Sequence, residues 1–165
     1  MKIYIGADHR GFELKNKLKD WLQTQDHEVI DCGNDHLDPQ DDYTDFARAV
    51  AEKVQLAQGL PGGGEDSPGV ADEISRTSSG LGILICGSGV GVSIVANRFR
   101  GVRCGLGFNK NQIKHAREND HINCLALAAD YIDTQTAQEM TKTFLSAIPK
   151  RQEKYLRRIR KIDQN

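Results

Sequence analysis

The sequence contains no apolar run long enough to cross a membrane, and its first residues do not form a signal peptide. The formal net charge is only -1, which argues against a protein that coats nucleic acid by bulk electrostatics. We therefore expect a cytoplasmic protein whose partners include neither a membrane nor a nucleic acid.

The spacings that bind metal ions are also missing. The chain has 4 cysteines and 5 histidines, but no Cys-x-x-Cys pair and no histidine placed to complete a zinc site. Each cysteine lies in or beside a short apolar segment, so we expect reduced and mostly buried thiols, and no metal or other cofactor. The four are Cys32, Cys86, Cys104 and Cys124.

Short apolar segments alternate with stretches of helical periodicity along the 165 residues. This alternation predicts a single α/β domain with a doubly wound, five-stranded parallel sheet. In such sheets ligands bind beyond the carboxyl ends of the strands. The strands are expected at residues 3–6, 28–31, 81–85, 102–104 and 124–127.

Two segments depart from this pattern. Residues 58–80 are rich in Gly, Pro and Ser, and we interpret them as an insertion. A helix at about 150–163 is strongly basic, and Lys154 and Arg158 share one face with two further cations. A solvated helix face is the ordinary explanation, and phosphate binding in a neighbouring subunit is the functional one.

A glycine-rich turn follows the most apolar strand. It comprises Gly87, Ser88, Gly89, Val90 and Gly91, and a helix is expected to begin within it. Backbone N–H groups in such a turn can approach a phosphate or an enediolate without interference from side chains. The glycines lack the dinucleotide-binding spacing, and tight strand-to-helix packing also explains them. We call residues 87–91 the cradle.

Cys86 occupies the last strand position before the cradle. A thiol near a helix N-terminus ionises more readily and can act as a base or a nucleophile. A small buried hydrophobic side chain is the alternative interpretation. Asp8 and His9 follow the first strand on the same sheet edge, where they could bind sugar hydroxyls or move protons. Asp8 could instead cap the helix that begins near Gly11.

These motifs resemble one known family, that of ribose-5-phosphate isomerase B and galactose-6-phosphate isomerase. The similarity rests on Gly6 to Lys15, on Asp42-Tyr43, and on the segment from Gly82 to Arg103, and it covers nearly the whole chain outside 58–80. The resemblance implies a Rossmann-like fold, a homodimer or homotetramer with sites at the subunit interface, and no metal or nucleotide.

The resemblance also implies aldose–ketose isomerisation of a phosphorylated sugar through a cis-enediolate. Cys86 matches the family's proton-transferring base, and the cradle matches the loop that stabilises the enediolate. Asp8, His9 and Tyr43 match positions at or near the sugar. Lys154 and Arg158 match two phosphate-binding arginines, with Lys a less geometrically demanding ligand than Arg.

Three positions depart from the family's pattern. Asn119 aligns with the ring-opening acid histidine, Asp120 aligns with a sugar-contacting Asn, and His121 is the nearest histidine that could replace the acid. Asp130 aligns with another phosphate-binding Arg, and its charge would repel phosphate. Tyr155 replaces a common His on the last helix.

The sequence therefore predicts a sugar-phosphate isomerase of pentose phosphate metabolism that acts on ribose 5-phosphate. Galactose-6-phosphate or another hexose 6-phosphate is the alternative substrate, with this chain as one subunit of a hetero-oligomer. A non-catalytic protein that binds sugar phosphates is the alternative from another class, and the changes at Asn119 and Asp130 motivate it.

Overall fold

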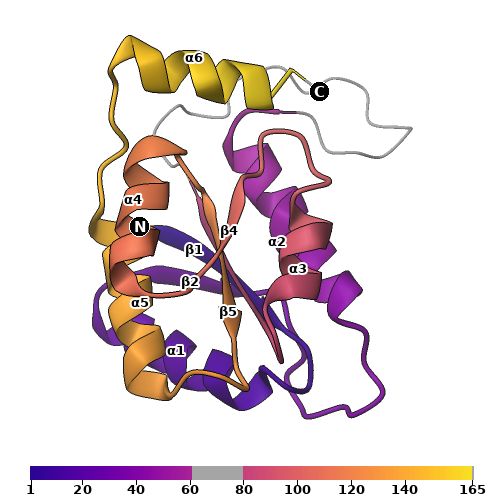
Figure 1. Ribbon diagram of the computed structural model, residues 1–165. Helices are drawn as coiled ribbons and strands as arrows, with labels where there is room; N and C mark the ends of the chain where they lie inside the picture. Colours follow the sequence, from indigo (N-terminus) through magenta and orange to yellow (C-terminus); the bar gives the residue numbers. More distant parts are fainter. Residues whose placement is uncertain (61–79, 165) are drawn as a thin grey trace.

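The computed structural model describes residues 1–60 and 80–164, so the predicted insertion at 58–80 lies almost wholly outside the described residues. Five parallel strands form one sheet in the order β2-β1-β3-β5-β4, and helices cover both faces (Figure 1). The predicted α/β fold is confirmed. The strands are β1 (Lys2–Ala7), β2 (Glu28–Asp31), β3 (Leu81–Cys86), β4 (Cys104–Leu106) and β5 (Cys124–Ala128).

Helices α1, α4 and α5 lie on one face of the sheet, and α2 and α3 lie on the other (Figure 1). Helix α6 lies across the amino ends of the strands. The bounds are α1 (Phe12–Thr24), α2 (Tyr43–Ala57), α3 (Val90–Ala96), α4 (Lys110–Asn119), α5 (Thr134–Ser146) and α6 (Glu153–Ile162). The fourth strand begins two residues later than predicted, because Val102 N–H instead closes a turn by donating to Phe99 O at 3.0 Å.

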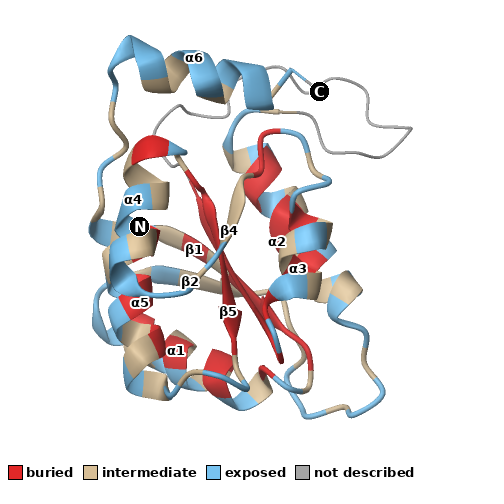
Figure 2. Ribbon diagram, in the orientation of Figure 1, coloured by how far each residue is buried: buried red, intermediate tan, exposed pale blue. Residues whose placement is uncertain are grey.

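Strand β3 is buried along its whole length in the middle of the sheet (Figure 2). Successive side chains of a strand point to opposite faces, so Ile83 and Ile85 pack towards α1 and α5. Leu84 and Cys86 pack towards α2 and α3. Cys86 therefore ends its strand on the face that α3, the helix following the cradle, covers.

A fully buried lysine anchors the loop that follows β2. The side chain of Lys15 in α1 has no exposed area, and its Nζ donates to both carboxylate oxygens of Asp31 at 2.9 Å. The same Nζ donates to Asn34 O at 2.6 Å. Burial opposes ionisation of Asp31, but its bonds to Lys19, Lys15 and Gly33 N–H outweigh that effect and lower its pKa.

We expect Asp31→Ala to lower the free energy of unfolding by about 3–5 kcal/mol, because it leaves the Lys15 ammonium buried without its counter-ion. Urea unfolding at pH 7 measures the loss. The depressed pKa of Asp31 makes this contribution present above the carboxyl's unfolded-state pKa and lost as the pH falls through its folded-state pKa. Glu28→Ala, which removes the exposed Lys2–Glu28 pair, is the matched control. Equal unfolding midpoints for the two variants would contradict the expectation.

Candidate active site

The cradle begins where β3 ends, and two of its glycines have a structural reason, one in its backbone conformation and the other in close packing. Gly89 precedes α3 with φ +71°, a left-handed conformation that disfavours side chains. A Cβ on Gly91 would lie 2.8 Å from the ring of Tyr43, which packs over the cradle from the start of α2. The structure thus brings Tyr43 to the cradle, as the sequence predicted.

Cys86 lies beside the cradle with its sulfur facing a backbone donor. The thiol is 5% exposed, and Gly89 N–H donates to Cys86 Sγ at 3.2 Å. Val90 N–H donates to Ser88 Oγ at 3.3 Å. Within the described parts of the chain, the N–H groups of Ser88 and Gly91 have no hydrogen-bond partner. The cradle therefore offers the N–H groups of Ser88 and Gly91 to an anion. These donors lie next to the Cys86 thiol, which already accepts from Gly89 N–H.

The other three thiols lack this setting. All four cysteines are free, and Cys86 and Cys124 are buried as predicted, whereas Cys32 and Cys104 are only half-buried. Burial raises the pKa of Cys32 to about 11, which keeps that thiol protonated at neutral pH. Among the residues described, no group of three His, Cys, Asp or Glu side chains could hold a metal ion.

Asp8 is buried and mainly organises the start of α1. Its Oδ1 accepts from Arg10 N–H and Gly11 N–H, each at 3.0 Å. Burial raises the pKa of Asp8 despite these two bonds and the nearby His9. These bonds belong to the turn that precedes α1, and the N-cap of the helix is Gly11 without a side-chain cap, so the interpretation of Asp8 as the N-cap is wrong. Binding of a sugar hydroxyl by Asp8 stays a prediction.

His9 pairs with a carboxylate that the sequence did not single out. Asp41 Oδ1 accepts from His9 N–H at 3.0 Å and lies 2.8 Å from His9 Nδ1. Because the carboxylate accepts, Nδ1 carries a hydrogen, and Nε2 of the neutral ring remains an acceptor. The side chain of Asp41 is only 6% exposed. Asp41 thus fixes the orientation of His9 at the carboxyl edge of the sheet.

Arg10 and Asp130 also meet at this edge. Arg10 donates to Asp130 Oδ2 from Nε at 3.1 Å and from Nη2 at 2.6 Å. This pairing raises the pKa of Arg10, which stays charged. The carboxylate of Asp130, expected from the sequence to repel phosphate, is therefore paired with a cation. Neither Arg10 nor Asp41 was recognised from the sequence as a site residue.

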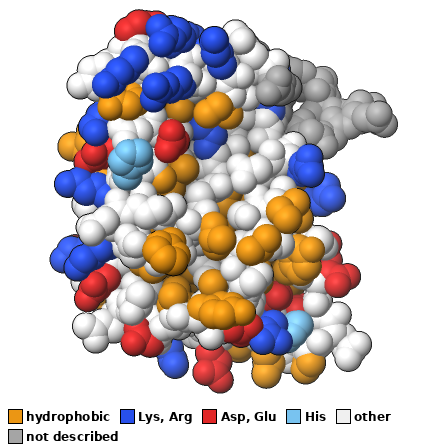
Figure 3. All heavy atoms as spheres, in the orientation of Figure 1, with side chains coloured by type: hydrophobic (Ala, Val, Ile, Leu, Met, Phe, Trp, Pro, Cys, Tyr) orange, Lys and Arg blue, Asp and Glu red, His pale blue; other side chains and the backbone are white. Residues whose placement is uncertain are grey.

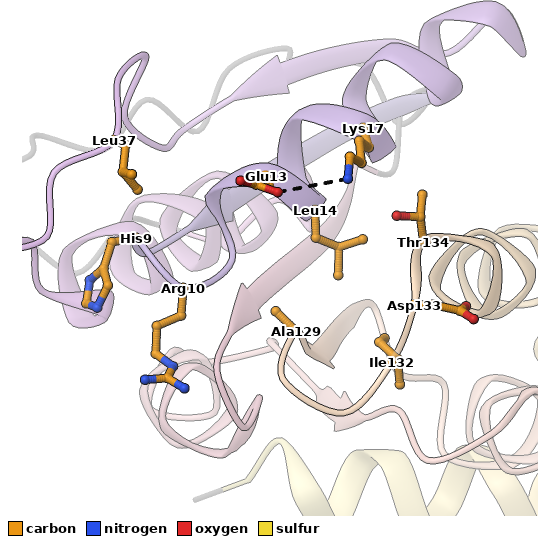
Figure 4. Close-up of a pocket in the computed structure, with 10 residues that line it drawn as sticks. All are labelled: His9, Arg10, Glu13, Leu14, Lys17, Leu37, Ala129, Ile132, Asp133 and Thr134. Carbon is orange, nitrogen blue, oxygen red and sulfur yellow. Dashed lines mark ion pairs between the residues drawn. The ribbon is translucent and has the colours of Figure 1, made fainter.

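A cavity of about 390 Å³ lies next to this edge, between the start of α1 and the start of α5 (Figure 4). His9 and Arg10 belong to its wall, whereas Cys86 and the cradle do not. The remaining wall residues are Glu13, Leu14, Lys17, Leu37, Ala129, Ile132, Asp133 and Thr134. The cavity therefore adjoins the carboxyl edge of the sheet on the face that α1 and α5 cover.

The remaining predicted residues lie at the other end of the sheet. In the register of β3 and β5, Cys86 is opposite Ala128, whereas Gly82 is opposite Cys124. Four strand residues span about 13 Å, and Asn119, Asp120 and His121 precede Cys124. One chain therefore does not bring these three residues to Cys86.

Local contacts hold this second group in place. Lys150 Nζ donates to Asn119 Oδ1 at 3.0 Å, and His121 Nε2 lies 2.8 Å from Lys150 O. Because a carbonyl only accepts, His121 Nε2 must carry the hydrogen. His121 also has φ 52°, in the left-handed region. Asp120 follows α4 directly and is exposed.

Helix α6 carries Lys154 and Arg158 at this same end. Both side chains are exposed, and the helix buries none of its residues. Lysine and arginine side chains gather over α6 at the top of Figure 3. Its apolar residues Tyr155, Leu156 and Ile159 are only half-buried. The basic helix predicted at 150–163 is therefore shorter and projects its cations into solvent.

The sequence matches the Ribose/Galactose Isomerase family over residues 3–61 and 67–162. A putative sugar phosphate isomerase from Bacillus subtilis is 36% identical over 146 residues, spanning 88% of this chain and 85% of the relative. A probable ribose-5-phosphate isomerase B from Mycoplasma genitalium is 33% identical over 145 residues, with 88% and 83% covered.

Solved structures agree with the sequence matches. Ribose-5-phosphate isomerase B from Mycoplasma genitalium, solved with bound ribulose-5-phosphate, has a TM-score of 0.83 at 33% identity, covering 99% of this chain and 94% of that one. The ribose 5-phosphate isomerase from Thermotoga maritima gives 0.80 at 35% identity, with 99% and 98% covered.

The fold, the cradle and these relatives define an enzyme of the sugar-phosphate isomerase class. More particularly, the chain belongs to the Ribose/Galactose Isomerase family. The resemblance inferred from the sequence motifs is thus confirmed. In the described part of the chain, no helix is both long and apolar enough to span a membrane.

Proposed function

We propose that this enzyme interconverts ribose 5-phosphate and ribulose 5-phosphate through a cis-enediolate, in the cytoplasm and without a metal or other cofactor. The observation that carries the proposal is the position of Cys86 Sγ, 3.2 Å from Gly89 N beside the unpaired amides of the cradle. Relatives named ribose-5-phosphate isomerase B, one of them solved with ribulose-5-phosphate, support the choice of sugar.

The chemistry follows from a thiolate placed next to amide donors. Cys86 as thiolate removes the proton from C2 of the open-chain aldose, and the electron pair of the broken C–H bond moves towards the carbonyl oxygen. The amides of the cradle stabilise the negative charge that develops on the enediolate oxygens. Transfer of the hydroxyl proton from the C2 oxygen to the C1 oxygen, followed by return of the abstracted proton from Cys86 to C1, gives the ketose and regenerates the thiolate.

Opening of the sugar ring requires an acid, and we assign this role to His121 in place of the family's histidine at Asn119. Asn119 and Asp120 then contact the sugar, and Lys154 and Arg158 bind its phosphate. Because these residues lie at the opposite end of the sheet from Cys86, they serve the site of another copy of the chain. His121 must give up its contact with Lys150 O to act in this way.

The proposed assembly is a homodimer or homotetramer with sites between subunits. Two properties of α6 support it. The apolar residues of the helix are not fully covered within one chain, and Ile162 is 51% exposed. The phosphate-binding cations share this helix, so docking against a second copy would bury the apolar face and deliver the charges to the partner's cradle.

A hexose 6-phosphate is the second candidate substrate, favoured by the amide of Asn119 at the acid position and by Asp130 at a phosphate position. The test is turnover of ribose 5-phosphate, galactose 6-phosphate and other hexose 6-phosphates by the purified protein under identical conditions. We expect the highest kcat/KM for ribose 5-phosphate. A higher value for a hexose 6-phosphate would overturn the choice of sugar, and stabilisation by sugar phosphates without any turnover would indicate a binding protein.

A further inference from the structure

The Arg10–Asp130 pair packs directly on the cradle. A Cβ placed on Gly87 would lie 2.5 Å from Arg10 Nε and 2.7 Å from Asp130 Oδ2. Asp130 N–H donates to Gly87 O at 3.1 Å, which ties the end of β5 to the same residue. The guanidinium group therefore lies above the first residue of the cradle, next to Cys86 in the chain.

Both ends of Arg10 are held in this position. The buried carboxylate of Asp8 accepts from Arg10 N–H, and Asp130 Oδ2 accepts from Nε and Nη2. Nη1 has no partner in the portion of the chain that the structure describes. A guanidinium with one edge anchored and another nitrogen unpaired is suited to donate to a ligand oxygen.

Within one chain, Arg10 brings a cation to a sheet edge that is rich in carboxyl groups. Asp8, Asp41 and Asp130 place three carboxyl groups at this edge, and Lys154 and Arg158 belong to the opposite end of the sheet. The side chain of Arg10 is 56% exposed, so solvent and ligand can reach it. An exposed ion pair contributes little to stability, which leaves ligand binding as the better explanation of its anchored geometry.

We propose that Arg10 is a substrate-binding residue whose Nη1 donates to an oxygen at the reacting end of the sugar, while Asp130 holds the guanidinium in place. The proposal rests on the proposed function, because that function places the sugar carbons beside Cys86 and the cradle. It also gives Asp130 a function, that of holding the Arg10 guanidinium, at a position where the family carries an arginine.

The test compares Arg10→Ala, Arg10→Lys and the double variant Arg10→Ala/Asp130→Asn with the unchanged protein. Loss of a charge-assisted hydrogen bond should weaken ribulose 5-phosphate binding by about 10-fold to 100-fold in all three variants. Titration calorimetry measures this binding, and inorganic phosphate serves as a second probe that should bind equally to all proteins. Lys2→Ala, which removes another exposed ion pair at the far end of β1, is the matched control.

Three results would overturn the proposal. If Arg10→Ala binds ribulose 5-phosphate with an affinity within two-fold of the unchanged protein, Arg10 does not contribute to substrate binding. Recovery of affinity in the double variant would show that Arg10 only neutralises Asp130. Parallel weakening of inorganic phosphate binding would assign Arg10 to the phosphate end. Equal thermal midpoints confirm that the variants fold. Because binding is measured without turnover, failure of the isomerase assignment is detected separately, by the absence of ribose 5-phosphate conversion in the unchanged protein.

Discussion

Cys86→Ala should lower kcat for ribose 5-phosphate isomerisation by at least about 10²–10⁴-fold, because removal of the base leaves no group to take the proton from carbon. The substitution should leave KM little changed, since the amides of the cradle remain. Cys86 is only 5% exposed, but alanine lacks only its sulfur atom. The substitution therefore leaves a small void, and the fold should be retained.

The measurement is steady-state turnover of ribose 5-phosphate, with thermal unfolding as the check on folding. Cys124→Ala is the matched control, because Cys124 is also buried on the α2 and α3 face but lies at the other end of its strand. Activity of Cys86→Ala close to that of the unchanged protein would refute the assignment of the base. Loss of activity in both variants alike would point to damaged packing instead.

Mixing two inactive variants should restore activity if each site combines residues from two copies. Cys86→Ala removes the proposed base at one sheet edge, and Lys154→Ala/Arg158→Ala removes the two cations on α6 that we propose bind the phosphate. Random exchange of subunits in a dimer makes half of the molecules mixed, each with one intact and one doubly defective site, so activity should approach about a quarter of the unchanged level.

The experiment requires that each variant alone has only residual activity on ribose 5-phosphate and that subunits are exchanged by mild denaturation and refolding. If the mixture is no more active than the mean of the two variants measured separately, Cys86 and the α6 cations act in the site of one and the same chain. That outcome would contradict the placement of α6 at the amino ends of the strands, since Cys86 lies at the carboxyl end of β3 (Figure 1).

The parts of the fold with strong local periodicity were predictable from the sequence. The apolar run at 81–85 became a buried central strand, and the glycine-rich turn after it lies at the carboxyl edge, as expected. The sequence could not give the burial of Lys15, because a lysine in a helical pattern is usually exposed. Its partners are Asp31 at the end of β2 and Asn34 in the loop that follows, and only the folded chain brings them to α1.

The same limit applies to the candidate site. Cys86 and the cradle were predicted because they follow a strand with a clear apolar pattern, whereas Tyr43 was predicted only from the family resemblance. The pairs His9–Asp41 and Arg10–Asp130 join residues 32 and 120 positions apart, and only the folded sheet brings them together. The placement of Asn119 and His121 away from Cys86 also required strand register, which motifs do not contain.

The half-covered apolar face of α6 carries a consequence for how the enzyme behaves in dilute solution. If the cations on this helix complete the cradle of another copy, the catalytic unit is the assembly and not the chain. Specific activity then becomes a function of protein concentration, falling once the enzyme is diluted below the dissociation constant of the subunits. A substrate that contacts both copies would bind only the assembled form and would therefore lower the apparent dissociation constant of the subunits. Specific activity should then fall at a lower protein concentration when the sugar phosphate is present.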